Sequence, residues 1–209
     1  MAKAFSVKEK AAIRAALLDK SLTHFARFGV RKARIADLCA AVGIAKGSFY
    51  AFFASKEALF MALADARDIQ HKADMRAYLL QTNAGRREVI GGFFDFMMER
   101  INTDPVLKIV RDTGELVHLS RSVPPEMLAE NTRRDLAFVD EVAAILRERH
   151  GVVHADAQTL TGLMSLMLAL GVQADVLAAA TDYDAMVALL RDLFVSRLLR
   201  GPLGDDQGD

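Results

Sequence analysis

The spacing of apolar residues is the feature that most restricts the fold of this chain. Apolar side chains recur every three or four residues along nearly all of the 209 positions, and the strict alternation that is typical of strands is missing from the sequence. The prolines stand at positions 105, 124, 125 and 202, at the ends of the periodic segments. This pattern predicts an all-α fold of about nine helices.

The N-terminal part of the sequence predicts three helices that pack together. Ser6 and Glu9 form a capping box at the start of a first helix, which we expect to end at Gly29. Two shorter helices follow at residues 35–42 and 46–53, joined by a glycine turn. Because helices of two turns are not stable alone, they must pack against the first helix. A short helix, a tight turn and a second short helix are typical of a helix-turn-helix.

The remainder predicts six longer helices and a polar tail. Ser55 is a good N-cap for a helix that runs to about residue 80. Further helices are expected at residues 86–103, 105–120, 125–149, 155–179 and 183–199. We therefore expect a helix-turn-helix domain at residues 1–54, a larger helical domain at residues 55–200, and a disordered tail at residues 201–209.

Charge is distributed unevenly along the sequence, although the formal net charge is zero. Residues 1–56 contain seven Lys and four Arg against Glu9, Asp19 and Asp37, which gives 11 − 3 = +8 and leaves −8 for the rest. A basic segment followed by an acidic body is typical of a nucleic-acid-binding module, because cations displace counterions from phosphates. The alternative interpretation is a solvated charged face.

The segment from Gly29 to Phe60 carries the most specific motif. It reads GVRKARIADLCAAVGIAKGSFYAFFASKEALF and closely resembles the helix-turn-helix of the TetR family of transcriptional repressors. The matching positions are Leu38, Gly43, Ile44, Lys46, Gly47, Ser48, Tyr50, Phe53, Ser55, Lys56 and Glu57. The resemblance implies a homodimer that binds a near-palindromic operator on double-stranded DNA and is released by a small, largely apolar effector.

The residue types at the matching positions agree with contacts to a DNA backbone. Lys46 and Gly47 begin the second short helix, where free N–H groups and the helix dipole favour a phosphate. Ser48 and Tyr50 supply hydroxyl donors on the same helix, and Lys56 supplies a cation from the next. Other predicted DNA-binding residues are Arg31, Lys32 and Arg34 on the flanking backbone, Ala51 and Phe52 on thymine methyl groups, and Phe49, which is equally compatible with a core position.

Three positions depart from the family pattern. Ala33 and Ala45 stand where family members often have Ser or Thr, so two helix caps are expected to be missing. Ala51 leaves the middle of the second short helix without a hydrogen-bonding side chain. Leu38, Cys39, Val42, Ile44 and Phe53 are predicted to be core residues.

The family resemblance also implies an effector pocket in the C-terminal part. The candidate lining residues are Phe93, Phe96, Met97, Arg111, Glu115, His118, Met127 and Asn131. The alternative is that the phenylalanine- and methionine-rich segment at residues 89–98 is simply a central core helix, which its residues alone favour.

Two C-terminal segments have apolar faces that one body cannot easily cover. We expect them to form a four-helix interface between two copies of the chain, with the candidate residues Gly162, Ser165, Met167, Ala169, Met186, Leu190, Leu193 and Phe194. The alternative is that both faces belong to the core of one chain.

Other classes of function find little support in the sequence. The five His residues are scattered, Cys39 is the single cysteine, and no metal-binding pair, phosphate-binding glycine loop or nucleophile elbow is present. We therefore expect no enzymatic activity, cofactor or metal. Without a signal-peptide core or membrane span, we expect a cytoplasmic protein that is nucleoid-associated when bound to DNA. The alternative function is a DNA-binding regulator or architectural protein that has no effector and whose C-terminal domain only dimerises.

Overall fold

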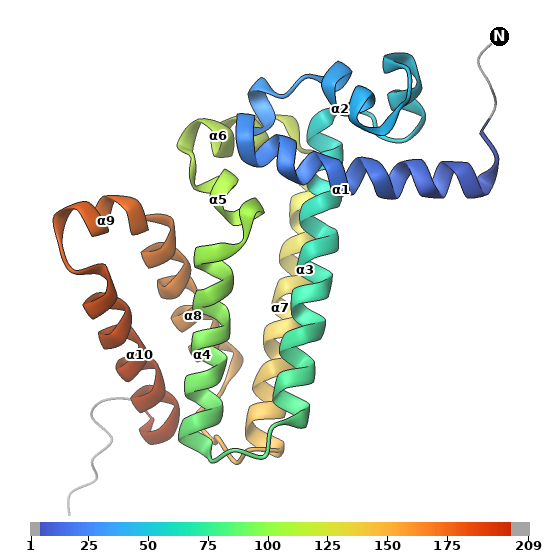
Figure 1. Cartoon of the computed structure of the whole chain (residues 1–209). Helices are drawn as coiled ribbons and strands as arrows, with labels where there is room; N and C mark the ends of the chain where they lie inside the picture. Colours follow the sequence, from blue (N-terminus) through green and yellow to red (C-terminus); the bar gives the residue numbers. More distant parts are fainter. Residues whose placement is uncertain (1–4, 202–209) are drawn as a thin grey trace, which may run out of the picture. The chain divides into compact units, whose positions relative to one another are not determined.

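The computed structural model describes residues 5–201, and these residues form helices without any strand (Figure 1). The predicted all-α class is confirmed, but the described residues contain eleven helical elements in place of about nine. They are α1 (Val7–Lys32), α2 (Ile35–Val42), the 3₁₀-helix η1 (Lys46–Ala51), α3 (Lys56–Gln81), α4 (Arg86–Thr103), α5 (Pro105–Arg111), α6 (Thr113–Ser122), α7 (Pro125–Glu148), α8 (Ala157–Val172), α9 (Ala174–Ala180) and α10 (Tyr183–Arg200).

Two of the predicted helices are each divided in the structure. The segment 105–120 forms α5 and α6, because the Asp112 side chain accepts a hydrogen bond from the backbone N–H of Glu115 at 2.9 Å and caps a new helix. The segment 155–179 forms α8 and α9, with Gln173 between them at φ −93° and ψ 9°. Neither division was predicted, because the apolar spacing continues across both breaks.

The chain forms two compact units. The first comprises residues 1–70 and 105–125, and the second comprises residues 71–104 and 126–209, as far as the structure describes them. Helix α3 contributes residues to both units. The predicted functional boundary after residue 54 stays a prediction, and most of the predicted tail, residues 202–209, lies outside the described residues.

The first unit has a core in which α1 packs against α2, α5 and α6. The Phe25 and Phe60 rings meet edge to face there, with their centroids 5.7 Å apart. The buried apolar residues of this core are Leu17, Phe25, Val30, Ala33, Leu38, Cys39, Phe49, Phe53, Leu59, Phe60, Leu63, Val106, Ile109 and Leu119. Helices α5 and α6 are therefore part of the same core as the helix-turn-helix.

The second unit is built around α4, which packs against α8 and α10 (Figure 1). The Phe194 ring lies 5.8 Å from the ring of Phe93 and 5.4 Å from that of Phe94, measured between centroids. Seven of the large α4 side chains are buried: Val89, Ile90, Phe93, Phe94, Met97, Met98 and Ile101. Helix α4 is thus a central core helix, as its residues alone suggested.

No single helix among the described residues has both the length and the apolar character needed to cross a membrane. One bent pair, α8 and α9 at 66°, meets both criteria when its two helices are taken together. Within the same part of the chain, no group of three or more His, Cys, Asp or Glu side chains is arranged to hold a metal ion.

Candidate nucleic-acid interface

Helix α1 begins with the capping box that the sequence predicts, but it ends at Lys32 and not at Gly29, where only a break occurs. The Glu9 backbone N–H donates to the Ser6 hydroxyl at 3.2 Å, and the Ser6 N–H donates to the Glu9 carboxylate at 2.8 Å. Helical dihedral angles stop at Gly29, which has φ 72° and ψ 166°. Only glycine adopts this conformation readily. Residues 30–32 then form one more turn before the connection to α2.

Helix α2 and η1 form the predicted helix-turn-helix, but the second element is shorter and tighter than expected. Gly43 ends α2 in the left-handed region at φ 73°, and η1 is a 3₁₀-helix at residues 46–51 in place of an α-helix at residues 46–53. Ala45 stands at its N-cap and gives no side-chain hydrogen bond, as predicted. The N-cap of α2 is Arg34, one residue later than predicted, and it also lacks such a bond.

The N-terminal end of η1 is open to solvent. Lys46, Gly47 and Ala51 are exposed, Ser48 is half-buried, and the Tyr50 side chain is 56% exposed. A Cβ built on Gly47 would meet no atom within 4 Å, so a ligand could approach the backbone closely at this point. A cation, free N–H groups and two hydroxyls on one exposed turn are suited to a phosphate.

Two aromatic residues of this segment face the protein interior. Phe49 is fully buried, with its ring centroid 6.1 Å from that of Phe53, so its predicted place at the DNA is corrected to a core position. Phe52 is half-buried and lies 6.0 Å from Phe5 between ring centroids. The predicted core residues Leu38, Cys39 and Phe53 are buried. Burial raises the pKa of the Cys39 thiol, and Lys46 offsets part of that rise.

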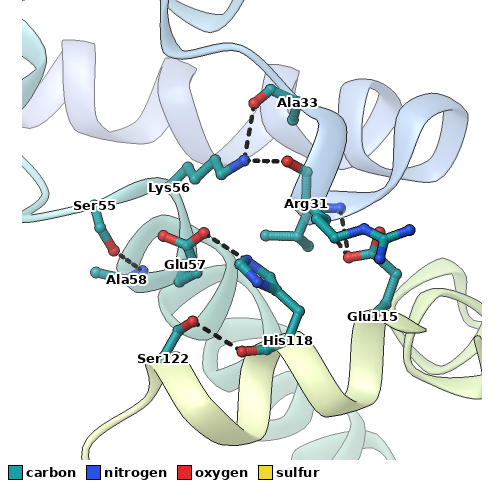
Figure 2. A network of polar contacts seen from close by, with 10 residues as sticks. Arg31, Ala33, Ser55, Lys56, Glu57, Ala58, Glu115, His118 and Ser122 are labelled. Carbon is teal, nitrogen blue, oxygen red and sulfur yellow. Dashed lines mark hydrogen bonds and ion pairs between the residues drawn. The ribbon is translucent and has the colours of Figure 1, made fainter. Parts of the chain in front are cut away.

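Basic side chains surround the α1–α2 connection. Arg31, Lys32 and Arg34 are exposed, as a DNA contact requires. Lys56 has a second role that the sequence did not indicate, because its ammonium group donates to the backbone carbonyls of Arg31 and Ala33 (Figure 2). Lys56 therefore helps to hold the connection in place. Its predicted phosphate contact stays a prediction.

Two predicted pocket residues on α6 are engaged with α1 and α3 (Figure 2). Glu115 is 6% exposed, and one of its carboxylate oxygens accepts hydrogen bonds from the N–H groups of Val30 and Arg31, each at 3.0 Å. The His118 Nε2 atom lies 2.8 Å from the Glu57 carboxylate. The spacing 111, 115, 118 revealed that these side chains share a helix face, but it could not reveal what the face contacts.

Burial alone would raise the pKa of Glu57, but hydrogen bonds from His118, from its own backbone and from Ser55 outweigh it. The pKa of Glu57 is therefore lower than its ordinary value of 4.5. The carboxylate stays ionised at neutral pH and provides a charged partner for His118.

The other predicted pocket residues divide between the two units. Arg111 belongs to the first unit with Glu115 and His118, whereas Phe93, Phe96, Met97, Met127 and Asn131 belong to the second. Within the second unit, the Phe96 ring lies 4.8 Å from His71 and 6.4 Å from Tyr78 between centroids. Met127 is 40% exposed, and the Asn131 side chain accepts a hydrogen bond from Arg134. An effector pocket stays a prediction.

The predicted dimer residues fall into two groups. Met167 and Phe194 are fully buried in the second unit, so their assignment to an interface is corrected: they are core residues of one chain. Gly162, Ser165, Ala169 and Leu193 are exposed, and Met186 and Leu190 are half-buried. Further exposed apolar side chains lie on α8, α9 and α10, namely Leu166, Leu168, Val172, Val176 and Leu189.

Comparisons with known proteins agree with this geometry. Residues 17–63 match the model of the family described as "Bacterial regulatory proteins, tetR family". A search of curated proteins finds no match. The matched segment begins inside α1 and ends in the first turns of α3, so it contains the whole helix-turn-helix.

Solved structures share the fold over nearly the full chain. A transcriptional regulator from Saccharomonospora viridis, in complex with choline, is 20% identical over 88% of this chain and 95% of its own, with a TM-score of 0.67. FadR from Bacillus halodurans, a fatty acid degradation regulator, is 18% identical over 92% and 97%, with a TM-score of 0.64. AibR, in complex with isovaleryl coenzyme A and operator DNA, is 13% identical over 91% and 100%, with a TM-score of 0.56.

Sequence identities this low show a shared fold alone. The resemblance to the tetR family depends on the matched N-terminal segment. That segment contains the glycine turn after α2, the exposed cationic end of η1 and the capped start of α3. Residues 17–63 of this chain are therefore similar to the helix-turn-helix segment of the tetR family of bacterial regulatory proteins, and the chain as a whole shares the fold of the solved regulators.

Proposed function

We propose that the chain is a transcriptional repressor that binds a near-palindromic operator as a dimer and is released by a small, largely apolar effector. The observation that carries the proposal is the exposed end of η1. Lys46, Gly47 and Tyr50 are accessible there, while the neighbouring Phe49 anchors the same turn in the core. An exposed, cationic helix start on a rigid core is suited to a phosphate beside a DNA groove.

Dimerisation is supported by the exposed apolar side chains of the second unit. Helices α8, α9 and α10 contact one another, and their outward residues include Leu166, Val176 and Leu189, which are 57%, 65% and 62% exposed. Apolar area of this extent on neighbouring helices favours association with a second copy, because burial removes it from water. A symmetric dimer would present two helix-turn-helix elements to two half-sites.

Release by an effector is supported by the fold. AibR was solved with isovaleryl coenzyme A and operator DNA, and the Saccharomonospora viridis regulator was solved with choline. Both share this fold although their ligands differ in chemistry, so the fold alone does not select a ligand. For this chain the proposal of a largely apolar ligand rests on the family resemblance, because most of the phenylalanines and methionines of α4 are core residues.

The proposed DNA contact is tested with genomic fragments that the purified protein retains. The affinity for the shortest retained duplex is measured over a range of salt concentrations for the wild type, Lys46→Gln and Lys20→Gln. Lys20 is an exposed α1 lysine, so it controls for the loss of one charge. We expect Lys46→Gln alone to lower the slope of log K against log salt by about 0.9. Failure of the wild type to retain any fragment contradicts the proposal.

The proposed effector response is tested on the same complex. Isovaleryl coenzyme A, choline and a series of free fatty acids are added as probes, and the melting temperature and DNA release are followed together. An apolar probe that raises the melting temperature and releases the duplex supports the proposal. Stabilisation without release by any probe supports a regulator that does not respond to an effector.

A further inference from the structure

The five residues between the break in α1 and the start of α2, Val30–Arg34, are called the basic junction below. Three of them, Arg31, Lys32 and Arg34, are exposed cations, and the other two are buried in the core of the first unit. The junction follows the non-helical Gly29, so a new helical turn starts at its first residues.

A carboxylate from a distant part of the sequence binds the first backbone N–H groups of this turn. One oxygen of Glu115 accepts from both Val30 and Arg31 at 3.0 Å, although these residues are 85 and 84 positions away in the sequence. Two N–H donors on one buried carboxylate form charge-assisted hydrogen bonds, and a negative group is favoured at the start of a helical turn. Glu115 thus acts as the cap that the junction lacks.

Gly29 is matched to this carboxylate. A Cβ atom at residue 29 would lie 2.3 Å from the second oxygen of Glu115, so the carboxylate occupies the space that any other side chain would need. Gly29 therefore satisfies two demands, the positive φ of the break and the close approach of Glu115.

The carbonyl side of the junction is held by a charge of opposite sign. Lys56 donates from its ammonium group to the carbonyls of Arg31 and Ala33 (Figure 2). The junction thus has an anion on its N–H groups and a cation on its C=O groups, which matches the polarity of the peptide bond on both sides.

The exposed side chains of the junction lie beside an open cavity. A cavity of about 370 Å³ is lined by Gly29, Arg31, Lys32 and Glu115 together with residues of α5. The side chains of Arg31 and Lys32 therefore border open space. The hydrogen bonds from Glu115 and Lys56, together with the buried Val30 and Ala33, hold the backbone that carries these cations.

Helix α6 is itself fixed at two points near Glu115. Asp112 caps its first turn, and His118, one turn after Glu115, contacts Glu57 on α3 at 2.8 Å. Glu57 directly follows Lys56 in the sequence, so the two restraints on the junction are supported by the same first turn of α3.

We propose that Glu115 is a positioning residue for DNA binding, an inference that depends on the proposed function. Its buried carboxylate fixes the basic junction in the conformation in which Arg31, Lys32 and Arg34 meet the phosphate backbone. A junction without this cap presents the same charges on a mobile backbone, so fewer of them bind phosphate at any one time. Helix α6 thereby influences the DNA affinity of a surface whose cations lie between α1 and α2.

The test compares Glu115→Ala and Glu115→Gln with the matched control Glu126→Ala, which removes an exposed glutamate from α7. The exchange rates of the Val30 and Arg31 amide protons are measured by NMR in the free protein, and operator affinity is measured over a range of salt. We expect Glu115→Ala to accelerate both amide exchanges and to weaken binding by roughly tenfold or more. It should also lower the slope of log K against log salt by about 0.9 for each phosphate that the junction no longer neutralises.

The slope separates positioning from a general loss of stability. A variant that merely unfolds in part binds more weakly with an unchanged slope, and that result overturns the inference. Glu115→Gln restores an acceptor without the charge and should fall between the wild type and Glu115→Ala. If Glu115→Ala does not fold, the test uses Glu115→Gln. An unchanged salt slope together with unchanged Val30 and Arg31 amide exchange rates in Glu115→Gln contradicts the inference.

A double-mutant cycle gives an independent measurement. If Glu115 acts through the junction, Lys32→Gln costs less affinity in the Glu115→Gln background than in the wild type. Additive losses overturn the inference. If the wild type binds no duplex, the proposed function fails and the inference fails with it. If the wild type binds the operator and the Glu115 variants keep the wild-type slope of log K against log salt, the inference is refuted but the proposed function is not.

Discussion

Lys46 and Lys56 carry the same charge in the same motif, but their environments differ. Lys46 is exposed at the start of η1, whereas Lys56 is half-buried and donates to two backbone carbonyls. A sequence motif assigns both residues to the DNA backbone because it records residue types and spacing, not the direction of a side chain. Contacts between residues 31 and 56 depend on how α1 and α3 pack, which no local pattern contains.

This difference predicts unequal effects on stability. Lys56→Met leaves two carbonyls without their charged donor, so we expect the free energy of unfolding to fall by about 1–3 kcal/mol. Lys46→Met changes an exposed side chain and should alter it by less than about 0.5 kcal/mol. Urea unfolding followed by circular dichroism measures both values. Equal stabilities of the two variants would contradict the structural role of Lys56.

The lowered pKa of Glu57 predicts how the free energy of unfolding depends on pH. Burial alone would raise its pKa, but hydrogen bonds from His118, its own backbone and Ser55 lower it below the ordinary 4.5. A carboxyl whose pKa is lowered by folding stabilises the folded chain above its unfolded pKa, and this contribution disappears as pH falls through the folded pKa. We therefore expect Glu57→Gln to flatten the loss of stability between about pH 5 and pH 3.

The measurement is the urea midpoint at successive pH values for the wild type, Glu57→Gln and the exposed control Glu126→Gln. The control should keep the steep wild-type profile. A Glu57→Gln profile that is as steep as the wild type would show that the carboxyl has the same pKa in the folded and unfolded chain.

At the level of elements, local signals in the sequence predicted helix starts well and helix contacts poorly. The capping box at Ser6 and the cap at Ser55 depend on neighbouring residues, and both are confirmed. The predicted end of the first helix at Gly29 is a break, after which α1 continues to Lys32. The burial of Met167 and Phe194 was missed, because both helices have apolar residues on several sides and periodicity does not choose which side faces the core.

The missing cap of η1 gives an element-scale prediction. Ala45 has φ −69° and ψ 146°, which suits an N-cap residue, but it lacks a side-chain acceptor for the first N–H groups of the helix. Ala45→Ser adds that acceptor, so we expect the free energy of unfolding to rise by about 1 kcal/mol. Ala12→Ser is the control, because Ala12 is an exposed residue inside α1 and serine does not favour a helix interior.

Thermal unfolding of both serine variants measures this effect, and Ala45→Ser should have the higher melting temperature. The amide exchange of Gly47 should slow in Ala45→Ser, whereas the Ser48 N–H already donates to the Ala45 carbonyl at 2.9 Å. An unchanged melting temperature together with unchanged exchange at Gly47 would mean that water already satisfies the start of η1.

At the scale of the whole molecule, exposed apolar area and segregated charge belong to different parts of the chain. Residues 1–56 carry a formal charge of +8, whereas the exposed leucines and valines of α8, α9 and α10 lie in the second unit. The family resemblance predicted both a DNA surface and a dimer surface. The sequence does not show which apolar residues of α8 and α10 remain exposed once each helix has packed against the core of its own chain. The structure shows this.

The dimer surface gives the last prediction. Leu189 is 62% exposed on α10, and a buried leucine contributes about 1.5–3 kcal/mol, counted twice in a symmetric interface. Leu189→Arg replaces that contribution with two buried like charges, so we expect a monomer at micromolar concentration. Val153→Arg adds the same charge at a site that is 68% exposed and outside α8, α9 and α10, and it should remain a dimer. Sedimentation velocity measures both states. Because each monomer presents only one helix-turn-helix, Leu189→Arg should also bind the operator more weakly at unchanged folding stability, and a wild type that sediments as a monomer contradicts the proposed dimer.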